Sequence, residues 1–179
     1  GFELWCHPKD ASEVWDKVWE CGKDLGIAPM GLEGLDMVRI EAGLIFGGFE
    51  FNDQTDPFEA GIGFSVALKT KEDDFVGKEA LVKRKASPQK KLVGLELIGK
   101  EQAVNGDGVH VGRATVGIIT SGMISPVLNK NIALCRMDVK YSDIGTKVEV
   151  GKIDGHQKRI AAKVVKFPFY DPEKIKVKS

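Results

Sequence analysis

The sequence predicts an α+β fold, with helices in its first half and a small antiparallel β-barrel or sandwich of about six strands in its second half. Three observations support this prediction. Two early segments place apolar side chains at helical spacing. A Gly-rich stretch, residues 43–66, follows them and is predicted to be mostly extended. From Leu92 onward, short runs of Val, Ile and Leu alternate with turn residues, which is typical of small antiparallel domains.

The first segment is predicted to contain a short strand and then a helix. Phe2–Cys6 is the expected strand. Asp10 followed by Glu13 resembles a capping box, and the apolar side chains of residues 11–25 then recur every three or four positions until Gly26 ends the helix. Three large aromatic side chains of this region are interpreted as one local packing core: Trp5, Trp15 and Trp19.

A second helix is expected over Leu32–Ala42, with Gly43 after its end. This segment is apolar on nearly every side, so the helix is predicted to be largely buried. Arg39 lies within its apolar stripe. Because an unpaired guanidinium in an apolar environment is costly, Arg39 is expected to bind a carboxylate, a carbonyl or a ligand.

A short helix over Gly77–Lys85 closes the first half. The segment Lys83–Lys91 carries five Lys or Arg in nine positions together with Ser87-Pro88, and it fits neither periodicity. We interpret it as a solvated linker between domains. A nucleic-acid-binding patch is the alternative, but aromatic side chains are not interleaved with these charges.

The second half is predicted to consist of short strands joined by turns. The expected strands are 92–98, 109–111, 114–121, 132–137, 147–150 and 159–166. The expected turns are Asn105–Gly108, Asp143–Gly145 and Asp154-Gly155. Strands of this length and spacing favour a small barrel or sandwich.

The composition excludes several classes of protein. Lys and Arg number 26, as do Asp and Glu, so the chain has no overall charge that would attract nucleic acid or acidic membranes. Its three cysteines form no CxxC pair, which argues against a disulfide framework or a four-thiolate metal site. Its apolar runs are shorter than the about 20 residues of a membrane span. We therefore expect a cytoplasmic protein with reduced thiols.

The sequence contains no clear pattern of metal ligands or of a catalytic nucleophile with its base. His7, His110 and His156 are far apart and lack further ligands at metal-binding spacing, so a zinc site is not expected. Ser121 lacks the strand–elbow–helix context of a hydrolase nucleophile. Two charged residues remain as candidates, Glu3 on the expected strand and Arg39. A carboxylate that accepts two donors and a held cation are what a cofactor with a pterin and a glutamate requires. A structural ion pair or exposure to solvent is the alternative.

Several segments together resemble the glycine cleavage T-protein family of folate-dependent aminomethyltransferases. Gly1–Leu4 resembles the end of the family's G-Y-T-G-E-x-G-[FV]-E-[IL] stretch, and Gly31–Gly43 resembles G-x-x-A-R-D-x-x-R-L-E-A-G. Asp53–Gly61 and Asp74–Leu81 are similar to its next two motifs. Gly117–Leu128 matches G-x-[VI]-T-S-G-x-x-S-P-x-L. The resemblance extends from residue 1 to about residue 170.

The resemblance implies a three-domain fold, of which this chain holds two parts. Residues 1–86 are expected to be the C-terminal part of the α/β folate-binding domain, and residues 87–179 the C-terminal β-barrel domain. The implied cofactor is tetrahydrofolate. The Glu3 carboxylate would accept hydrogen bonds from the pterin ring N–H and amino group, and Arg39 would lie near the bound folate.

The implied function is transfer of a one-carbon unit from a small aminomethyl or methylated amine-type donor to tetrahydrofolate, with a lipoyl carrier protein as a possible partner. The family's aspartate beside the folate nitrogens belongs to the N-terminal half, so no catalytic residue is expected here. The chain also begins with Gly1 rather than methionine. We therefore expect a fragment that is inactive alone.

Three alternatives stay open. Gly34-Leu35 replaces the family's Ala-Arg, which leaves room for a folate-dependent demethylase of another methyl donor. A second alternative is a non-enzymatic folate-binding relative of the kind that assists iron–sulfur cluster assembly, although Asp74–Ala80 lacks the K-G-C-[YF]-x-G-Q motif of those proteins. A third is self-association through an open strand edge at Phe2–Cys6.

Overall fold

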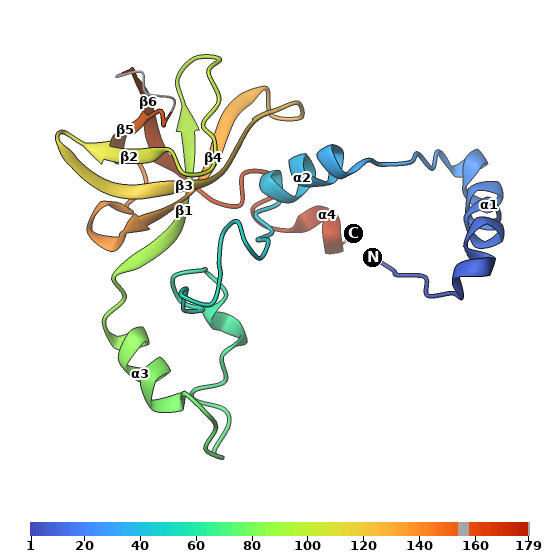
Figure 1. The fold of residues 1–179 in the computed structure, drawn as a ribbon, viewed down its shortest axis with the longest axis horizontal. Helices are drawn as coiled ribbons and strands as arrows, with labels where there is room; N and C mark the ends of the chain where they lie inside the picture. The colour runs from blue at the N-terminus through green and yellow to red at the C-terminus, as the bar shows by residue number, and fades with distance from the viewer. Residues whose placement is uncertain (154–157, 179) are drawn as a thin grey trace. The chain divides into compact units, whose positions relative to one another are not determined.

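The computed structural model describes residues 1–153 and 158–178 of the chain. The chain forms two compact units, residues 1–35 and 36–179. Figure 1 shows the helices of the first half and the strands of the second half. The predicted turn at Asp154-Gly155 and His156 lie outside the described residues. The domain boundary at residues 86–87 stays a prediction.

The first unit contains the predicted helix. A 3-10 turn, Pro8–Asp10, leads into α1, Ala11–Gly22, and a second 3-10 turn, Lys23–Leu25, ends at Gly26 with φ of 80°. This positive φ is a conformation that glycine adopts at little cost, so the predicted end of the helix is confirmed. The predicted capping box is wrong, because Asp10 makes no side-chain hydrogen bond at the helix start.

Two further predictions for this unit are wrong. Phe2–Cys6 has no regular structure, since no second strand of the described chain pairs with it. The tryptophans do not form a buried core: Trp5 is 89% exposed, and Trp15 and Trp19 are also exposed. Trp15 and Trp19 line a shallow apolar hollow. Periodicity identified the apolar face of α1, but it carries no information about what covers that face.

The second helix, α2, is Leu32–Glu41 and is followed by Gly43 with φ of 69°. Its extent agrees with the prediction, but the expected burial is wrong. Only Arg39, Ile40 and Glu41 are buried, while Leu32 at the start is 85% exposed. The last turn is buried because Ile40 packs in a cluster with Leu92, Met123, Ile132 and Leu134 of the barrel strands.

Residues 43–77 consist of turns and irregular chain, whereas residues 43–66 were predicted to be mostly extended. They contain one isolated bridge, Gly47 to Phe51, and one 3-10 turn, Gly63–Ser65. Contacts to the barrel hold this segment in place. The Leu92 amide donates to the Glu59 carbonyl at 2.9 Å, and Arg136 Nη1 donates to Thr55 Oγ1 at 2.8 Å.

The predicted helix at the end of this segment is confirmed as α3, Lys78–Ala86. The predicted linker is shorter than expected. Lys83, Arg84 and Lys85 belong to the last turn of α3, where basic side chains interact favourably with the helix dipole. The first barrel strand already begins at Lys90, so residues 87–89 alone connect the two elements.

The six predicted strands are confirmed, and they close into a barrel rather than a sandwich (Figure 1). Every neighbouring pair is antiparallel, in the order β1-β4-β3-β2-β5-β6. The strands are β1 Lys90–Leu97, β2 Gly108–Val111, β3 Ala114–Ser125, β4 Lys130–Asp138, β5 Lys147–Gly151 and β6 Arg159–Val165. A 3-10 turn, Val139–Tyr141, follows β4, and a short helix, α4 Ile175–Lys178, comes near the C-terminus.

Alternating apolar side chains form the barrel core. In β6, for example, Ile160, Ala162 and Val164 are buried while the intervening residues face outward. Cys135 of β4 lies in the same core, and its burial raises the pKa of the thiol to about 12. Cys6 and Cys21 are exposed.

We therefore expect two thiols of the native protein to react rapidly with 5,5′-dithiobis(2-nitrobenzoate) at pH 8, and the third only after unfolding. Thiolate is the reactive form, and Cys135 is both inaccessible and protonated at this pH. A variant that keeps only Cys135, Cys6→Ser/Cys21→Ser, is the control. Rapid reaction of this variant without denaturant would contradict the closed barrel.

The residues after β6 pack back onto α2 and the barrel. Phe167 and Phe169 contact the cluster around Ile40, and the Tyr170 amide donates to the Glu41 carbonyl at 2.9 Å. At Gly94, an added Cβ would lie 2.8 Å from Phe169 Cε1, so the ring packs directly on the backbone of β1. This segment thus fixes the end of α2 against the barrel.

Candidate functional site

Arg39 is the centre of a buried hydrogen-bond network. Its guanidinium donates through Nε to Asp36 Oδ1 at 2.7 Å, through Nη1 to Glu50 Oε2 at 2.6 Å, and through Nη2 to Ser121 Oγ at 2.8 Å. The Arg39 side chain is only 1% exposed. The expectation that Arg39 must find a carboxylate, a carbonyl or a ligand is met by two carboxylates and a hydroxyl.

Glu50 is the buried counter-ion of Arg39. Its second oxygen, Oε1, accepts from Ser121 Oγ at 2.5 Å, and Oε2 also accepts from the Phe46 amide at 2.9 Å. Burying a pair of opposite charges is tolerable when hydrogen bonds also satisfy their remaining donors and acceptors. Ser121 provides this for both partners, because its hydroxyl accepts from Arg39 and donates to Glu50.

The network reaches the surface through three other side chains. The Asp36 side chain is 48% exposed, although its Oδ1 is bound to Arg39. The rings of Phe46 and Phe49 flank the guanidinium, with their centroids 4.9 and 5.5 Å from Arg39 Cζ. Both phenylalanines are exposed. One carboxylate and two aromatic rings are therefore exposed around a single buried cation.

A second serine of β3 repeats the arrangement. Ser125 Oγ donates to Glu41 Oε1 at 2.5 Å and accepts from the Leu128 amide at 2.9 Å. Ser125 and Glu41 are both buried. The end of α2 is therefore attached to β3 at two points, through Arg39 with Glu50 and through Glu41.

A β-bulge turns these serines toward α2. Ile119 packs in the barrel core, whereas Met123, four residues later in the same strand, packs with Ile40 of α2. In a regular strand these two residues would face the same side. The register with β4 shifts between Ile119 and Ser121, which redirects the residues that follow toward the outer face.

Gly122, next in the strand, fits this site because it lacks a side chain. An added Cβ would lie 2.4 Å from the Ala103 carbonyl oxygen. The backbone of residue 103 therefore approaches β3 more closely than any other amino acid would permit.

The two residues predicted as cofactor-binding lie in different units. Glu3 is exposed in the first unit, in a stretch without regular structure. Arg39 is buried in the second unit. Their roles toward a cofactor stay predictions.

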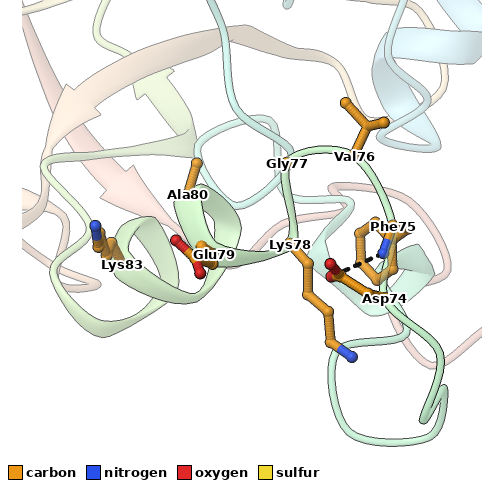
Figure 2. Close-up of a pocket in the computed structure, with 8 residues that line it drawn as sticks. All are labelled: Asp74, Phe75, Val76, Gly77, Lys78, Glu79, Ala80 and Lys83. Atoms are coloured by element: carbon orange, nitrogen blue, oxygen red, sulfur yellow. Dashed lines mark hydrogen bonds between the residues drawn. The ribbon is translucent and has the colours of Figure 1, made fainter.

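An open cavity of about 630 Å³ lies at the start of α3 and is lined by Asp74–Ala80 and Lys83 (Figure 2). Its polar groups bind the chain itself. Lys78 Nζ donates to the carbonyls of Lys71, Glu72 and Asp73 at 3.3, 3.3 and 3.0 Å. Figure 2 shows the Asp74 carboxylate bonded to the Phe75 amide. With these groups engaged locally, the cavity is a weaker candidate than the Arg39 network.

Within the described residues, His, Cys, Asp and Glu side chains do not gather in a group of three or more that could hold a metal ion. No helix among residues 1–153 and 158–178 has the length and apolar character to cross a membrane.

Comparison with family models identifies the family of the chain. Residues 90–171 match the model of the glycine cleavage T-protein C-terminal barrel domain, and residues 1–70 match the GCVT N-terminal domain. The chain belongs to the glycine cleavage T-protein family. The barrel is the C-terminal domain of that family, as the resemblance implied.

Individual relatives agree with this T-protein assignment. The chain is 59% identical over its full length to the trimethylamine-oxide aldolase of Ruegeria pomeroyi and spans 23% of that protein. It is 43% identical over 171 residues, 95% of the chain, to the aminomethyltransferase of Symbiobacterium thermophilum and spans 44% of that protein. The chain thus spans less than half the length of either relative.

A solved T-protein structure shows the same fold. The crystal structure of glycine cleavage system aminomethyltransferase T from Bartonella henselae superposes with a TM-score of 0.78 at 24% identity. The superposition covers 89% of this chain and 43% of that one.

Two partners of Arg39, Glu50 and Ser121, were not predicted from the sequence. Thr120, Ser121 and Gly122 lie within strand β3. Glu50 carried a usable signal, because an acidic residue between Phe49 and Phe51 breaks an apolar run, as Arg39 does in α2. Nothing in the sequence, however, shows that residue 121 faces residue 50.

Proposed function

We propose that this chain is part of a tetrahydrofolate-dependent one-carbon transferase. The observation that carries the proposal is the match of both family domains, in order, along residues 1–70 and 90–171. Similarity to aminomethyltransferases at more than 40% identity along 95% of the chain supports it. The exposed Cys6 and Cys21 suit the cytoplasm, where thiols stay reduced.

In this proposal Glu3 binds the pterin. A carboxylate has two acceptor oxygens, so it can accept from the ring N–H and the amino group together, and its exposure leaves both oxygens accessible. Arg39 lacks that accessibility. Its contribution to the folate site is therefore to hold Asp36, Phe46 and Phe49 in place.

Calorimetry with tetrahydrofolate tests the folate role. The measurement compares this chain with a polypeptide extended upstream to the length of the relatives, since the family's folate site includes its other half. We expect the extended form to bind, and Glu3→Ala to weaken binding about tenfold or more, because a charge-assisted bidentate contact is lost.

The matched control is Glu13→Ala, an exposed glutamate of α1. It should bind tetrahydrofolate like the unaltered protein. An extended form that binds no folate would contradict the proposal, whereas equal effects of the two substitutions would remove only the role of Glu3.

A second part of the proposal concerns the one-carbon donor. The 59% identity to the trimethylamine-oxide aldolase exceeds the 43% identity to the aminomethyltransferase. This difference favours trimethylamine N-oxide as the donor for the complete protein. Aldolase-type cleavage of (CH3)3NO gives (CH3)2NH and CH2O, and CH2O condenses with tetrahydrofolate to give 5,10-methylenetetrahydrofolate and water. The folate domain would thus capture the reactive aldehyde beside its source.

The full-length protein supplied with methyl-13C trimethylamine N-oxide and tetrahydrofolate tests the donor. We expect labelled dimethylamine and labelled methylenetetrahydrofolate. The comparison is an aminomethyl-lipoyl carrier, the donor and partner implied by the T-protein resemblance. Turnover of that carrier alone would overturn the amine-oxide donor and leave the folate role intact. Folate binding without turnover of either donor would favour the non-enzymatic alternative.

A further inference from the structure

We infer that Ser121 and Ser125 of the barrel are positioning residues for the folate-side segment, residues 36–51. This inference rests on the proposed function, because it assigns the barrel a role at the folate site that its own core does not require. Each serine binds a buried carboxylate of that segment, Glu50 or Glu41, at 2.5 Å.

The serines lie on the outer face of the barrel, away from its core. Ser121 follows the bulge that ends the inward pattern at Ile119. Among the described residues, its hydroxyl bonds Arg39 and Glu50, which both lie outside the barrel strands. Removing the hydroxyl therefore leaves the barrel core intact. It removes one partner from each member of a buried ion pair.

Loss of the Ser121 hydroxyl leaves one donor of Arg39 and one acceptor of Glu50 without a hydrogen-bond partner. Arg39 Nη2 and Glu50 Oε1 are both buried, and an unsatisfied charged group is costly where water does not reach it. The segment can relieve this cost by moving, because residues 43–51 are turns and irregular chain with a single isolated bridge. The first effect is thus expected in this segment rather than in the barrel.

Such a movement would displace the exposed groups that Arg39 holds. Asp36 is fixed through Oδ1, and the rings of Phe46 and Phe49 lie against the guanidinium. These three side chains are the part of the network that a ligand can reach. The chain of contacts therefore runs from Ser121 through Glu50 and Arg39 to the surface.

Amide hydrogen exchange of this chain tests the first half of the inference. In Ser121→Ala we expect the Phe46 amide, which donates to Glu50 Oε2, to exchange about tenfold faster or more, with the Ile119 amide of the barrel unchanged. Ser142→Ala is the matched control, since the Val139 carbonyl is the one partner of its hydroxyl among residues 1–153 and 158–178. Unchanged exchange at Phe46, or equal acceleration at Phe46 and Ile119, overturns the inference.

Tetrahydrofolate affinity of the upstream-extended polypeptide tests the second half. Ser121→Ala and Ser121→Ala/Ser125→Ala should raise the dissociation constant at least about fivefold at a temperature where the barrel stays folded, whereas Ser142→Ala should not. Faster exchange without weaker binding overturns the positioning role. Absence of tetrahydrofolate binding by the unaltered protein overturns the proposed function, and the positioning role with it. In that case the amide-exchange result still shows whether the serines hold residues 36–51 in place.

Discussion

Arg39→Met is expected to lower the free energy of unfolding by about 3–5 kcal/mol, the usual cost of removing one partner of a buried ion pair. Methionine preserves much of the apolar volume but leaves Glu50 fully buried without its cation. Asp36 and Ser121 each lose a hydrogen bond as well. Urea denaturation followed by circular dichroism measures the change.

Two further variants make the Arg39 experiment decisive. Arg84→Met removes an exposed arginine whose nearest carboxylate, Asp56, is 4.0 Å away, so it should cost less than about 1 kcal/mol. Arg39→Met/Glu50→Gln removes the uncompensated charge and should recover part of the loss. If Arg39→Met cost no more than Arg84→Met, the buried network would not hold the segment.

Gly122→Ala is expected to destabilise the protein by about 1–3 kcal/mol or more, although it adds only one methyl group. The new Cβ would lie 2.4 Å from the Ala103 carbonyl oxygen and 3.1 Å from its carbonyl carbon. Both are backbone atoms, so relief requires movement of a strand or of residue 103 rather than rotation of a side chain. Thermal unfolding measures the loss.

Gly47→Ala is the matched control for Gly122→Ala. Its added Cβ would meet only the Phe51 ring, at 3.6 Å, an ordinary contact distance. Gly47 also lacks the positive φ that would strain an alanine. We expect little change in its melting temperature. Equal effects of the two substitutions would mean that the bulge region of β3 adapts easily.

The barrel could be predicted from the sequence because its signals are local. Each strand has its own run of branched apolar residues. In β6 the side chains alternate in burial, and Ile160, Ala162 and Val164 face inward. The helical stretch that α1 begins and the 3-10 turn Lys23–Leu25 completes, with its end at Gly26, was predictable for the same reason, since helix periodicity and glycine termination are both local signals.

The burial of the first half could not be predicted in the same way. Apolar periodicity identifies a face, as it did for Trp15, Trp19 and Leu32, but it does not say whether the chain supplies anything to cover that face. These side chains are exposed among the described residues. The prediction failed because burial depends on residues distant in sequence.

The Arg39 network could be predicted only in part. Sequence analysis established that Arg39 needed a partner, because the cost of an unpaired buried cation is general. It did not identify Ser121, which is 82 residues away and faces Arg39 only because a bulge changes the direction of β3. Irregular strand geometry of this kind has no reliable signature in a single sequence.

The most direct test of the proposed folate role is a crystal structure of the upstream-extended polypeptide with tetrahydrofolate. We predict that both Glu3 carboxylate oxygens lie within about 3 Å of pterin donors, at hydrogen-bond distance. We also predict that Arg39 keeps its bonds to Glu50 and Ser121 and does not contact the ligand. A pterin bound elsewhere, or an Arg39 that leaves Glu50 to bind folate, would contradict the proposed folate role.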